Sequence, residues 1–249
     1  MQRADDVVQT LWIGDALSTM ERMSLNSFLA HGHRVHLYTY GDVAGVPDGV
    51  ERCDAEEILP SSMIFQYSEF PSYAGFANHF RYELLHRRGG WWADTDVICL
   101  RPFAVERDHV VACEAHKGAT HAANCVLKAP AGSALMRYAA DVCRAKDPAT
   151  LYWGDTGAWL LVEALEKFGM QECLAPSAMF CGIDCVEWES VLAPDPPALN
   201  GGLGLHLWNE MWRRNGRDKN ARYAPTSLYE RFRAMFDVSF QGERGIPHR

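Results

Sequence analysis

The stretch Gly89-Gly90-Trp91-Trp92-Ala93-Asp94-Thr95-Asp96-Val97-Ile98-Cys99-Leu100 decides the fold that we expect. A glycine pair ends a predicted helix, two tryptophans lead into a strand, and two carboxylates precede a second apolar run. Alternate side chains of an extended segment point the same way, so Asp94 and Asp96 would present their oxygens to one place. Such a pair suits a divalent ion, Mg²⁺ or Mn²⁺. A bare Asp-x-Asp also arises by chance, so its surroundings decide its weight.

The length and composition are those of a globular α/β protein. The chain has 249 residues, of which 48% are hydrophobic and 22% charged. This length allows one large domain or at most two small ones. The formal net charge of −8 argues against a nucleic-acid partner, because such surfaces carry an excess of Lys and Arg. An acidic protein can still bind an anionic nucleotide if a metal ion supplies positive charge.

The N-terminus and the cysteines favour a cytoplasmic protein. Residues 1–6 contain no apolar signal core, and no later run approaches membrane-spanning length. The eight cysteines are scattered without a C-x-x-C pair, which is typical of reduced, mostly buried thiols. A zinc cluster built from Cys181 and Cys185 is the alternative.

A strand–helix–strand unit opens the chain. Residues 7–14 form an apolar predicted strand, and Ser18 with Glu21 makes a capping box for a helix that runs to about His31. Residues 34–40, rich in β-branched and aromatic side chains, form the next strand. Such a unit predicts a mostly parallel sheet flanked by helices.

A predicted helix leads into the carboxylate pair. Apolar residues recur at helical spacing from Ser72 onward. Asn78 and Arg81 are three residues apart and share one face of this helix. Arg81 alone would more often be a solvated charge. Beside an amide, and leading to two carboxylates, it becomes a candidate ligand for a polyhydroxylated or anionic substrate.

The rest of the chain predicts further elements of the same domain. We expect strands at 50–53, 109–115, 124–129 and 203–208, and helices at 131–146, 155–168 and 226–236. Residues 180–197 should be irregular, because their proline run excludes a central strand. The prediction is a single domain over 1–249, with a nucleotide-binding half at about 7–100 and a donor and acceptor half at about 101–240.

Four stretches, in order, resemble family 32 glycosyltransferases and their relatives, the large clostridial glucosylating toxins. Residues 11–14 resemble their first-strand signature, and residues 76–85 resemble their Ser-Asp-x-x-Arg-Tyr helix. Residues 89–96 resemble their Gly-Gly-x-Tyr-x-Asp-x-Asp metal motif, and residues 206–212 their C-terminal His…Trp segment. The resemblance implies a GT-A fold, a Rossmann-like sheet with the metal site at its mid-chain carboxylates. It also implies sugar transfer from a nucleoside diphosphate, most often UDP, with retention at the anomeric carbon.

The resemblance also implies roles for single residues. Trp12 would stack on uracil between Leu11 and Ile13, and Asn78 and Arg81 would hold the donor sugar. Asp94 and Asp96, with Thr95 between them, would bind the metal ion and the ribose, and His206 would complete the metal shell. Trp212 would contact the β-phosphate. Asp155 would contact hydroxyls of the donor or the acceptor. Asn78 departs from the family's Asp, which removes a charged contact and puts the donor sugar's identity in doubt.

The chemistry of transfer leaves two routes open. A Mg²⁺ or Mn²⁺ held by Asp94 and Asp96 would stabilise the leaving diphosphate, and a neutral His206 would favour Mn²⁺. No nucleophile is obvious in the sequence. This absence fits front-face attack, in which the leaving diphosphate takes the proton from the hydroxyl group of the acceptor. Double displacement through Asp155 is the competing route.

Each site residue also has a structural interpretation. Trp12, Trp91 and Trp92 could be core aromatics, with Trp91 and Trp92 mainly structural. His206 could be a hydrogen-bonded core histidine, and Asp155 a helix N-cap.

Two other functions fit parts of the sequence. A haloacid-dehalogenase-like phosphatase would use Asp94-Thr95-Asp96 with a later lysine, Lys117 or Lys128. A sugar-nucleotide-binding protein without turnover would fit the departure at Asn78. The interpretation that we favour is a transferase acting on a glycan or glycolipid acceptor, as in capsular or lipopolysaccharide synthesis. The basic and aromatic segment 208–222 offers peripheral membrane contact as an alternative to an ordinary mixed-charge surface.

Overall fold

A mixed six-stranded sheet forms the centre of the molecule, and its strand order is β3-β2-β1-β4-β7-β6. The computed structural model describes residues 7–116, 119–199 and 201–237. The predicted domain 1–249 extends outside these ranges, and residues 1–6, where we expect no signal core, lie outside them. Both predicted halves, 7–100 and 101–240, contribute strands to this sheet, so their division of labour stays a prediction.

Eight strands and six α-helices make up the regular structure of the described residues. The strands are β1 (Val7–Leu11), β2 (Arg34–Thr39), β3 (Val50–Asp54), β4 (Gly90–Ala93), β5 (Val97–Cys99), β6 (Val110–His116), β7 (Ala119–Ala129) and β8 (Gly204–His206). The α-helices are α1 (Thr19–Ala30), α2 (Ala74–Arg88), α3 (Ala134–Ala145), α4 (Ala158–Phe168), α5 (Asn209–Arg214) and α6 (Leu228–Phe236). The irregular segment 180–197 contains a 3₁₀ helix over Cys185–Leu192.

The sheet is parallel on one side and antiparallel on the other. β3, β2, β1 and β4 run parallel to one another, as the strand–helix–strand pattern predicted. β7 runs antiparallel to both β4 and β6. The prediction of a mostly parallel sheet is therefore correct for four strands. β6 and β7 depart from it, because they pair in antiparallel fashion, which needs no crossover helix.

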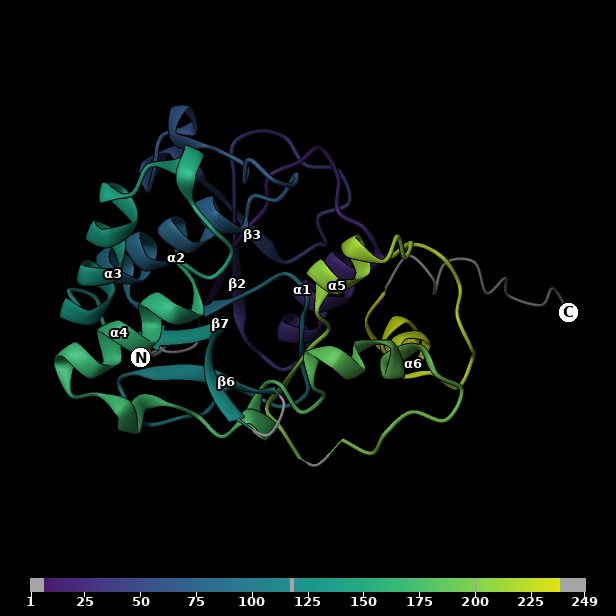
Figure 1. Ribbon diagram of the computed structural model, residues 1–249. Coiled ribbons are helices and arrows are strands. Elements are labelled where there is room, and N and C mark those ends of the chain that lie inside the picture. Colours follow the sequence, from purple (N-terminus) through teal and green to yellow (C-terminus); the bar gives the residue numbers. More distant parts are fainter. Residues whose placement is uncertain (1–6, 117–118, 200, 238–249) are drawn as a thin grey trace, which may run out of the picture.

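Helices cover both faces of the sheet (Figure 1). α2, α3 and α4 pack on one face, and α1 and α6 lie on the other side together with the small β5–β8 sheet. Neighbouring residues of β4 serve different cores, because Trp91 belongs to the cluster on the α1 side and Trp92 to the cluster on the α2 side. This alternation buries both tryptophans, and the predicted α/β class with helix-flanked sheet is confirmed.

Helix ends follow the chemistry of the sequence. The Ser18 side chain accepts a hydrogen bond from the first turn of α1 while Glu21 accepts the Ser18 backbone N–H, which confirms the capping box. α2 ends at Gly89, whose φ of 65° favours glycine. A Cβ at Gly89 would collide with the backbone of Ala131, so the glycine also lets the β7–α3 connection pass the start of β4.

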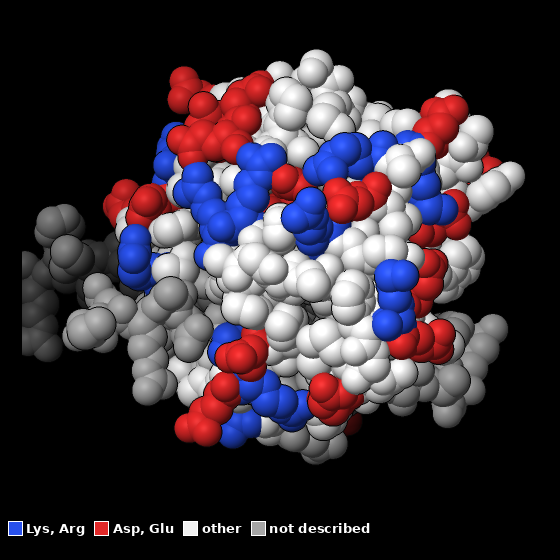
Figure 2. Space-filling view, turned by 90° about the vertical axis from the view of Figure 1, so that its left-hand side faces the viewer, with Lys and Arg blue, Asp and Glu red and all other residues white. Residues whose placement is uncertain are grey.

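The surface on the α2–α4 side carries both signs of charge. Figure 2 shows Lys and Arg side chains lying among Asp and Glu side chains, with uncharged surface between them. On α3, for example, the exposed side chains of Arg144 and Asp141 form an ion pair. This face therefore lacks the continuous basic surface of a nucleic-acid-binding protein. Among the described residues, no helix combines the length and apolarity needed to cross a membrane.

Candidate metal and nucleotide site

The carboxylate pair lies in a turn between β4 and β5. The Asp94 N–H donates to the Cys125 carbonyl at 2.8 Å, and the Val97 N–H donates back to the Asp94 carbonyl at 3.0 Å. The extended segment that we predicted for Asp94 to Asp96 is therefore wrong, because the chain turns at Thr95 and Asp96. The expected convergence is nevertheless present: ligand atoms of Asp94, Asp96 and His206 lie within 4.8 Å of one another.

His206 reaches the pair through a strand pairing that spans the sequence. β8 runs antiparallel to β5, with His206 opposite Val97. His206 Nε2 lies 3.1 Å from Asp96 Oδ2, and the Asn209 backbone N–H donates to the same oxygen at 2.7 Å. The small β5–β8 sheet thus carries the imidazole to the carboxylate motif.

Electrostatics hold Asp96 and His206 as an ion pair. Burial alone would raise the pKa of Asp96, but the charge and hydrogen bond of His206 hold it below its usual range. Burial opposes the imidazolium, yet Asp96 raises the pKa of His206 well above its usual value. Burial raises the pKa of Asp94, and Arg81 counteracts that rise. The pKa values of the two aspartates are thus shifted in opposite directions, upward for Asp94 and downward for Asp96.

Arg81 contacts the motif itself. Its guanidinium lies 3.1 Å from Asp94 Oδ1 and also donates to the Asn124 carbonyl. The Trp92 indole N–H donates to the same Asp94 oxygen at 2.8 Å, and the Arg81 guanidinium lies 4.9 Å from the centre of the Trp92 ring. Trp92 therefore packs in the core, as we predicted, and its indole N–H also holds Asp94 at the cavity wall.

Asn78 lies beside Arg81 in a network of uncharged polar groups. Its Nδ2 donates to Thr156 Oγ1 at 3.2 Å, and its Oδ1 accepts from Asn124 Nδ2 at 2.6 Å. Asn78 and Arg81 are 5% and 4% exposed, so burial and hydrogen bonds hold both side chains at the wall of the cavity described below.

One cavity of about 610 Å³ collects most of the predicted site residues. This volume is within the usual range for small-molecule sites. The predicted residues that line it are Leu11, Trp12, Ile13, Asn78, Arg81, Asp94, Thr95, Asp96 and His206. Sequence reasoning missed other lining residues, among them Trp92, Glu114, Asn124, Cys125, Trp153 and Trp159. Of these, Trp92 lies in the stretch 89–100 that the sequence singled out, whereas β7 offered no signal for Asn124 or Cys125.

Trp12 lies at the wall of the cavity directly after β1. It is partly buried, and its indole nitrogen is buried without a hydrogen-bond partner among the described residues. The Lys219 ammonium lies 5.5 Å from the centre of its ring. Trp12 thus packs partly on the core and partly faces the cavity, as a residue that stacks on a planar ligand would.

Asp155 and Trp212 do not line the cavity, although chain neighbours of both residues do. The Asp155 carboxylate accepts the Tyr152 N–H at 3.2 Å and lies 3.8 Å from Lys146 Nζ. The N-cap of α4 is Gly157, so Asp155 is not the N-cap either. Trp212 is 0% exposed, and its indole N–H donates to the Leu207 carbonyl. A phosphate contact would need that buried N–H, so the structure does not support the role predicted for Trp212.

The donor set fits a divalent ion that prefers oxygen. Two carboxylates and one imidazole, with their ligand atoms within 4.8 Å, suit Mg²⁺ or Mn²⁺. Both contacts described above for Asp94 fall on Oδ1, and both for Asp96 fall on Oδ2. These bonds orient the two carboxylates in the way that supporting hydrogen bonds orient metal ligands.

Part of the chain matches a family of known proteins. Residues 20–115 match the family model described as a glycosyltransferase sugar-binding region containing a DXD motif. This region is less than half of the chain, and it holds α2, Asp94 and Asp96. A comparison with curated proteins gives no match.

Similar solved structures include two that are described as glycosyltransferases. PaToxG glycosyltransferase has 12% identity over 93% of this chain and 86% of its own, with a TM-score of 0.48. The glycosyltransferase GlyE of Streptococcus pneumoniae TIGR4 also has 12% identity, over 98% of this chain and 66% of its own, with a TM-score of 0.44. Likeness at this level is too weak to transfer a function.

Proposed function

We propose that this chain is a metal-dependent retaining glycosyltransferase that moves a sugar from a nucleoside-diphosphate sugar, preferably a UDP-sugar, to a glycan or glycolipid acceptor. One observation carries the proposal: Asp94 and Asp96 of the Asp-x-Asp motif share a cavity with Arg81 and Trp12. A flat aromatic wall, a guanidinium and a carboxylate pair are the groups that a base, a sugar diphosphate and its metal ion require. The match of residues 20–115 supports the same class of reaction.

The nucleotide would occupy the Trp12 end of the cavity. Trp12 offers a ring face for the base, and Leu11 and Ile13 line the cavity on either side of it. Stacking of a base on an aromatic side chain stabilises nucleic-acid complexes by about 1–3 kcal/mol. The diphosphate would then extend toward Asp94 and Asp96, and Thr95 would lie beside the ribose.

The metal ion would be held by Asp94 and Asp96, with His206 Nε2 as a third ligand. A bound Mn²⁺ or Mg²⁺ supplies Lewis-acid stabilisation of the leaving diphosphate. Arg81 positions Asp94 for this task, because it bonds to Oδ1 of the same carboxylate. Asn78 and Asn124 present amide groups to the sugar, and both line the cavity.

The position of Asp155 favours front-face attack over double displacement. Asp155 does not line the cavity, and its carboxylate is engaged by Tyr152 and Lys146. In front-face attack the acceptor hydroxyl forms the new bond on the side from which the diphosphate departs, and its proton passes to that diphosphate. Glu114 also lines the cavity and is the carboxylate to test as a covalent nucleophile. Turnover that survives in Glu114→Gln would favour the front-face route.

The phosphatase alternative is not favoured by the geometry. Lys128 donates to the Val105 carbonyl at 2.8 Å and does not line the cavity. Lys117 lies outside the described residues. A sugar-nucleotide-binding protein without turnover shares the proposed site and differs only in the products formed.

A donor screen tests the proposal. UDP-glucose, UDP-galactose, UDP-N-acetylglucosamine and GDP-mannose are each incubated with the protein, with and without Mn²⁺, and released nucleoside diphosphate is measured. We expect Mn²⁺-dependent release from one donor and its loss in Asp94→Asn. Asp141→Asn, which removes an exposed carboxylate of α3, is the matched control and should keep the activity. Nucleotide binding without release of the nucleoside diphosphate would support the alternative of a binding protein without turnover. If the protein neither bound nor cleaved any of these donors, the proposed site would be wrong.

A further inference from the structure

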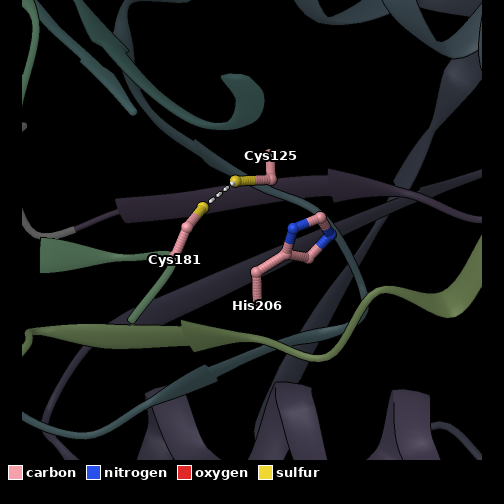
Figure 3. Close-up of side chains that lie close together, drawn as sticks. All are labelled: Cys125, Cys181 and His206. Atoms are coloured by element: carbon pink, nitrogen blue, oxygen red, sulfur yellow. Dashed lines mark hydrogen bonds between the residues drawn. The ribbon is translucent and has the colours of Figure 1, made fainter. Parts of the chain in front are cut away.

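Two buried thiols face the imidazole of His206 on the side away from Asp96. Cys125 of β7 and Cys181 lie with their sulfur atoms 3.6 Å apart, and they are 1% and 3% exposed. Their sulfurs and a ring nitrogen of His206 lie within 4.8 Å of one another. Figure 3 shows the three side chains converging, with one ring nitrogen on the side of the sulfurs. Cys185, the partner that the sequence suggested for Cys181, is not part of this group.

The free nitrogen of His206 provides a second, independent observation. His206 Nε2 is engaged by Asp96 at 3.1 Å, whereas Nδ1 is buried, makes no hydrogen bond of ordinary geometry among the described residues, and meets only the Cys125 thiol. A buried polar atom without a partner is costly, so it calls for an explanation. The Trp208 ring lies 4.1 Å from the imidazole, centre to centre, and helps to fix its orientation.

We propose that Cys125 Sγ, Cys181 Sγ and His206 Nδ1 form a second ion site, for a thiophilic ion such as Zn²⁺, next to the carboxylate site. In a tetrahedral site with Zn–S bonds of about 2.3 Å, two sulfurs lie about 3.8 Å apart. The observed 3.6 Å is close to this separation and far from the roughly 2.0 Å of a disulfide. An ion can approach from the cavity, which Cys125 and His206 both line.

Asp96 completes the arrangement from the other side of the ring. A histidine that binds a metal through one nitrogen usually donates its other N–H to a carboxylate, which fixes the tautomer. His206 has this geometry, with Nε2 toward Asp96 Oδ2 and Nδ1 toward the thiols. Binding would release the two thiol protons, because thiolates are the ligands. The fourth position would be open toward the cavity, as in zinc sites that hold water.

The two ion sites would compete for one side chain. When Nδ1 binds the thiophilic ion, Nε2 carries the proton that it donates to Asp96 and cannot serve as a ligand beside Asp94 and Asp96. Zn²⁺ should therefore weaken Mn²⁺ binding at the carboxylates. This consequence rests on the proposed function, whereas occupancy of the thiol site does not.

Cobalt titration of the reduced, metal-free protein tests the site directly, because Co²⁺ replaces Zn²⁺ and gives a thiolate charge-transfer absorption that oxygen ligands do not give. We expect one Co²⁺ bound with this absorption, displacement by Zn²⁺ and no displacement by excess Mn²⁺. Cys125→Ser and Cys181→Ser should each lose or strongly reduce the absorption. Cys143→Ser removes a buried thiol of α3, in the core on the other face of the sheet, and should keep it.

Two further variants separate the sites and guard against misfolding. Asp94→Asn should keep the thiolate absorption, while Asp96→Asn should keep it with a 10–100-fold weaker Co²⁺ affinity, as expected for loss of a carboxylate that orients a ligand. The melting temperature of each serine variant is measured first, to show that it folds. Where a serine variant does not fold, Cys125→Ala or Cys181→Ala takes its place. Absence of the absorption in the folded, reduced wild type would overturn the proposal. So would its persistence in both cysteine variants, or a Cys125–Cys181 disulfide that resists reduction.

Discussion

The Arg81 guanidinium lies 3.1 Å from Oδ1 of Asp94, so the arginine predicted to bind the donor also holds the first carboxylate of the metal motif. The Arg81 side chain is 5% exposed and that of Asp94 is 25% exposed, so the pair lies at the inner wall of the cavity. Arg81 therefore has two tasks: it positions a proposed metal ligand and supplies positive charge near the proposed diphosphate.

Removing this guanidinium should lower the stability of the folded protein. We expect Arg81→Ala to lower the free energy of unfolding by about 3 kcal/mol, because it leaves a largely buried carboxylate without its charged partner. Denaturant titration measures this loss. Arg137→Ala breaks an exposed pair with Asp141 and should cost less than about 1 kcal/mol. Equal costs for both variants would show that the Arg81–Asp94 pair has no structural role.

Trp12 should matter for nucleotide affinity more than for stability. Trp12→Ala removes the ring proposed to stack on the base, and we expect UDP binding to weaken by about 1–3 kcal/mol, that is, about 5- to 150-fold. Calorimetric titration with UDP measures the change. Trp12→Phe keeps a stacking face and should recover most of the affinity. If UDP affinity is the same in all three proteins, Trp12 belongs to the core alone.

Trp212 should behave in the opposite way. Its indole N–H donates to the Leu207 carbonyl, and its ring packs 4.7 Å, centre to centre, from Tyr229. We expect Trp212→Phe to lower the free energy of unfolding by about 1–3 kcal/mol through the unpaired carbonyl, with unchanged UDP affinity. A large loss of UDP affinity in a stably folded variant would restore Trp212 to the phosphate site.

Buried His79 of α2 should make stability depend on pH. Burial, with a contribution from Arg144, lowers the pKa of His79 to about 4 from its ordinary 6.5. The unfolded chain therefore binds this proton more tightly than the folded chain, so stability falls as pH drops from 6.5 toward 4. The slope from this group is at most about 1.4 kcal/mol per pH unit.

A substitution isolates this contribution. Unfolding free energies measured at several pH values should fall less steeply in His79→Gln than in the wild type. His121→Gln, at an exposed position of β7, should keep the steeper dependence. Parallel curves for wild type and His79→Gln would contradict the assignment to His79.

Local chemistry explains which parts of the fold could be predicted from the sequence. The capping box at Ser18, the glycine end of α2 and the period of the apolar residues act over a few residues, so these elements lie close to where they were expected. The β5–β8 pairing joins residues about a hundred positions apart and has no such local signal. Only the family resemblance pointed to His206, and the structure shows the pairing that brings it to Asp96.

The sequence predicted which residues line the site better than it predicted which of their side chains contact one another. The convergence of Asp94 and Asp96 was expected from an extended segment, whereas a turn produces it. Nothing in the spacing of Arg81 and Asp94, or of Cys125 and Cys181, indicates that these side chains meet, because their contacts depend on how α2, β7 and the loop that carries Cys181 pack. Asp155 and Trp212 show the limit of transferring roles by motif, since a matching residue can lie outside the cavity.

The central claim is that Asp94 and Asp96 hold a divalent ion that binds a nucleoside diphosphate in this cavity. Calorimetric titration of UDP into the protein with and without Mn²⁺, repeated for Asp96→Asn, tests it most directly. We predict binding at least about tenfold tighter with Mn²⁺, that is, about 1.4 kcal/mol, and loss of this difference in Asp96→Asn but not in Asp141→Asn. UDP affinity that is independent of Mn²⁺, or a Mn²⁺ effect that survives in Asp96→Asn, would contradict the account.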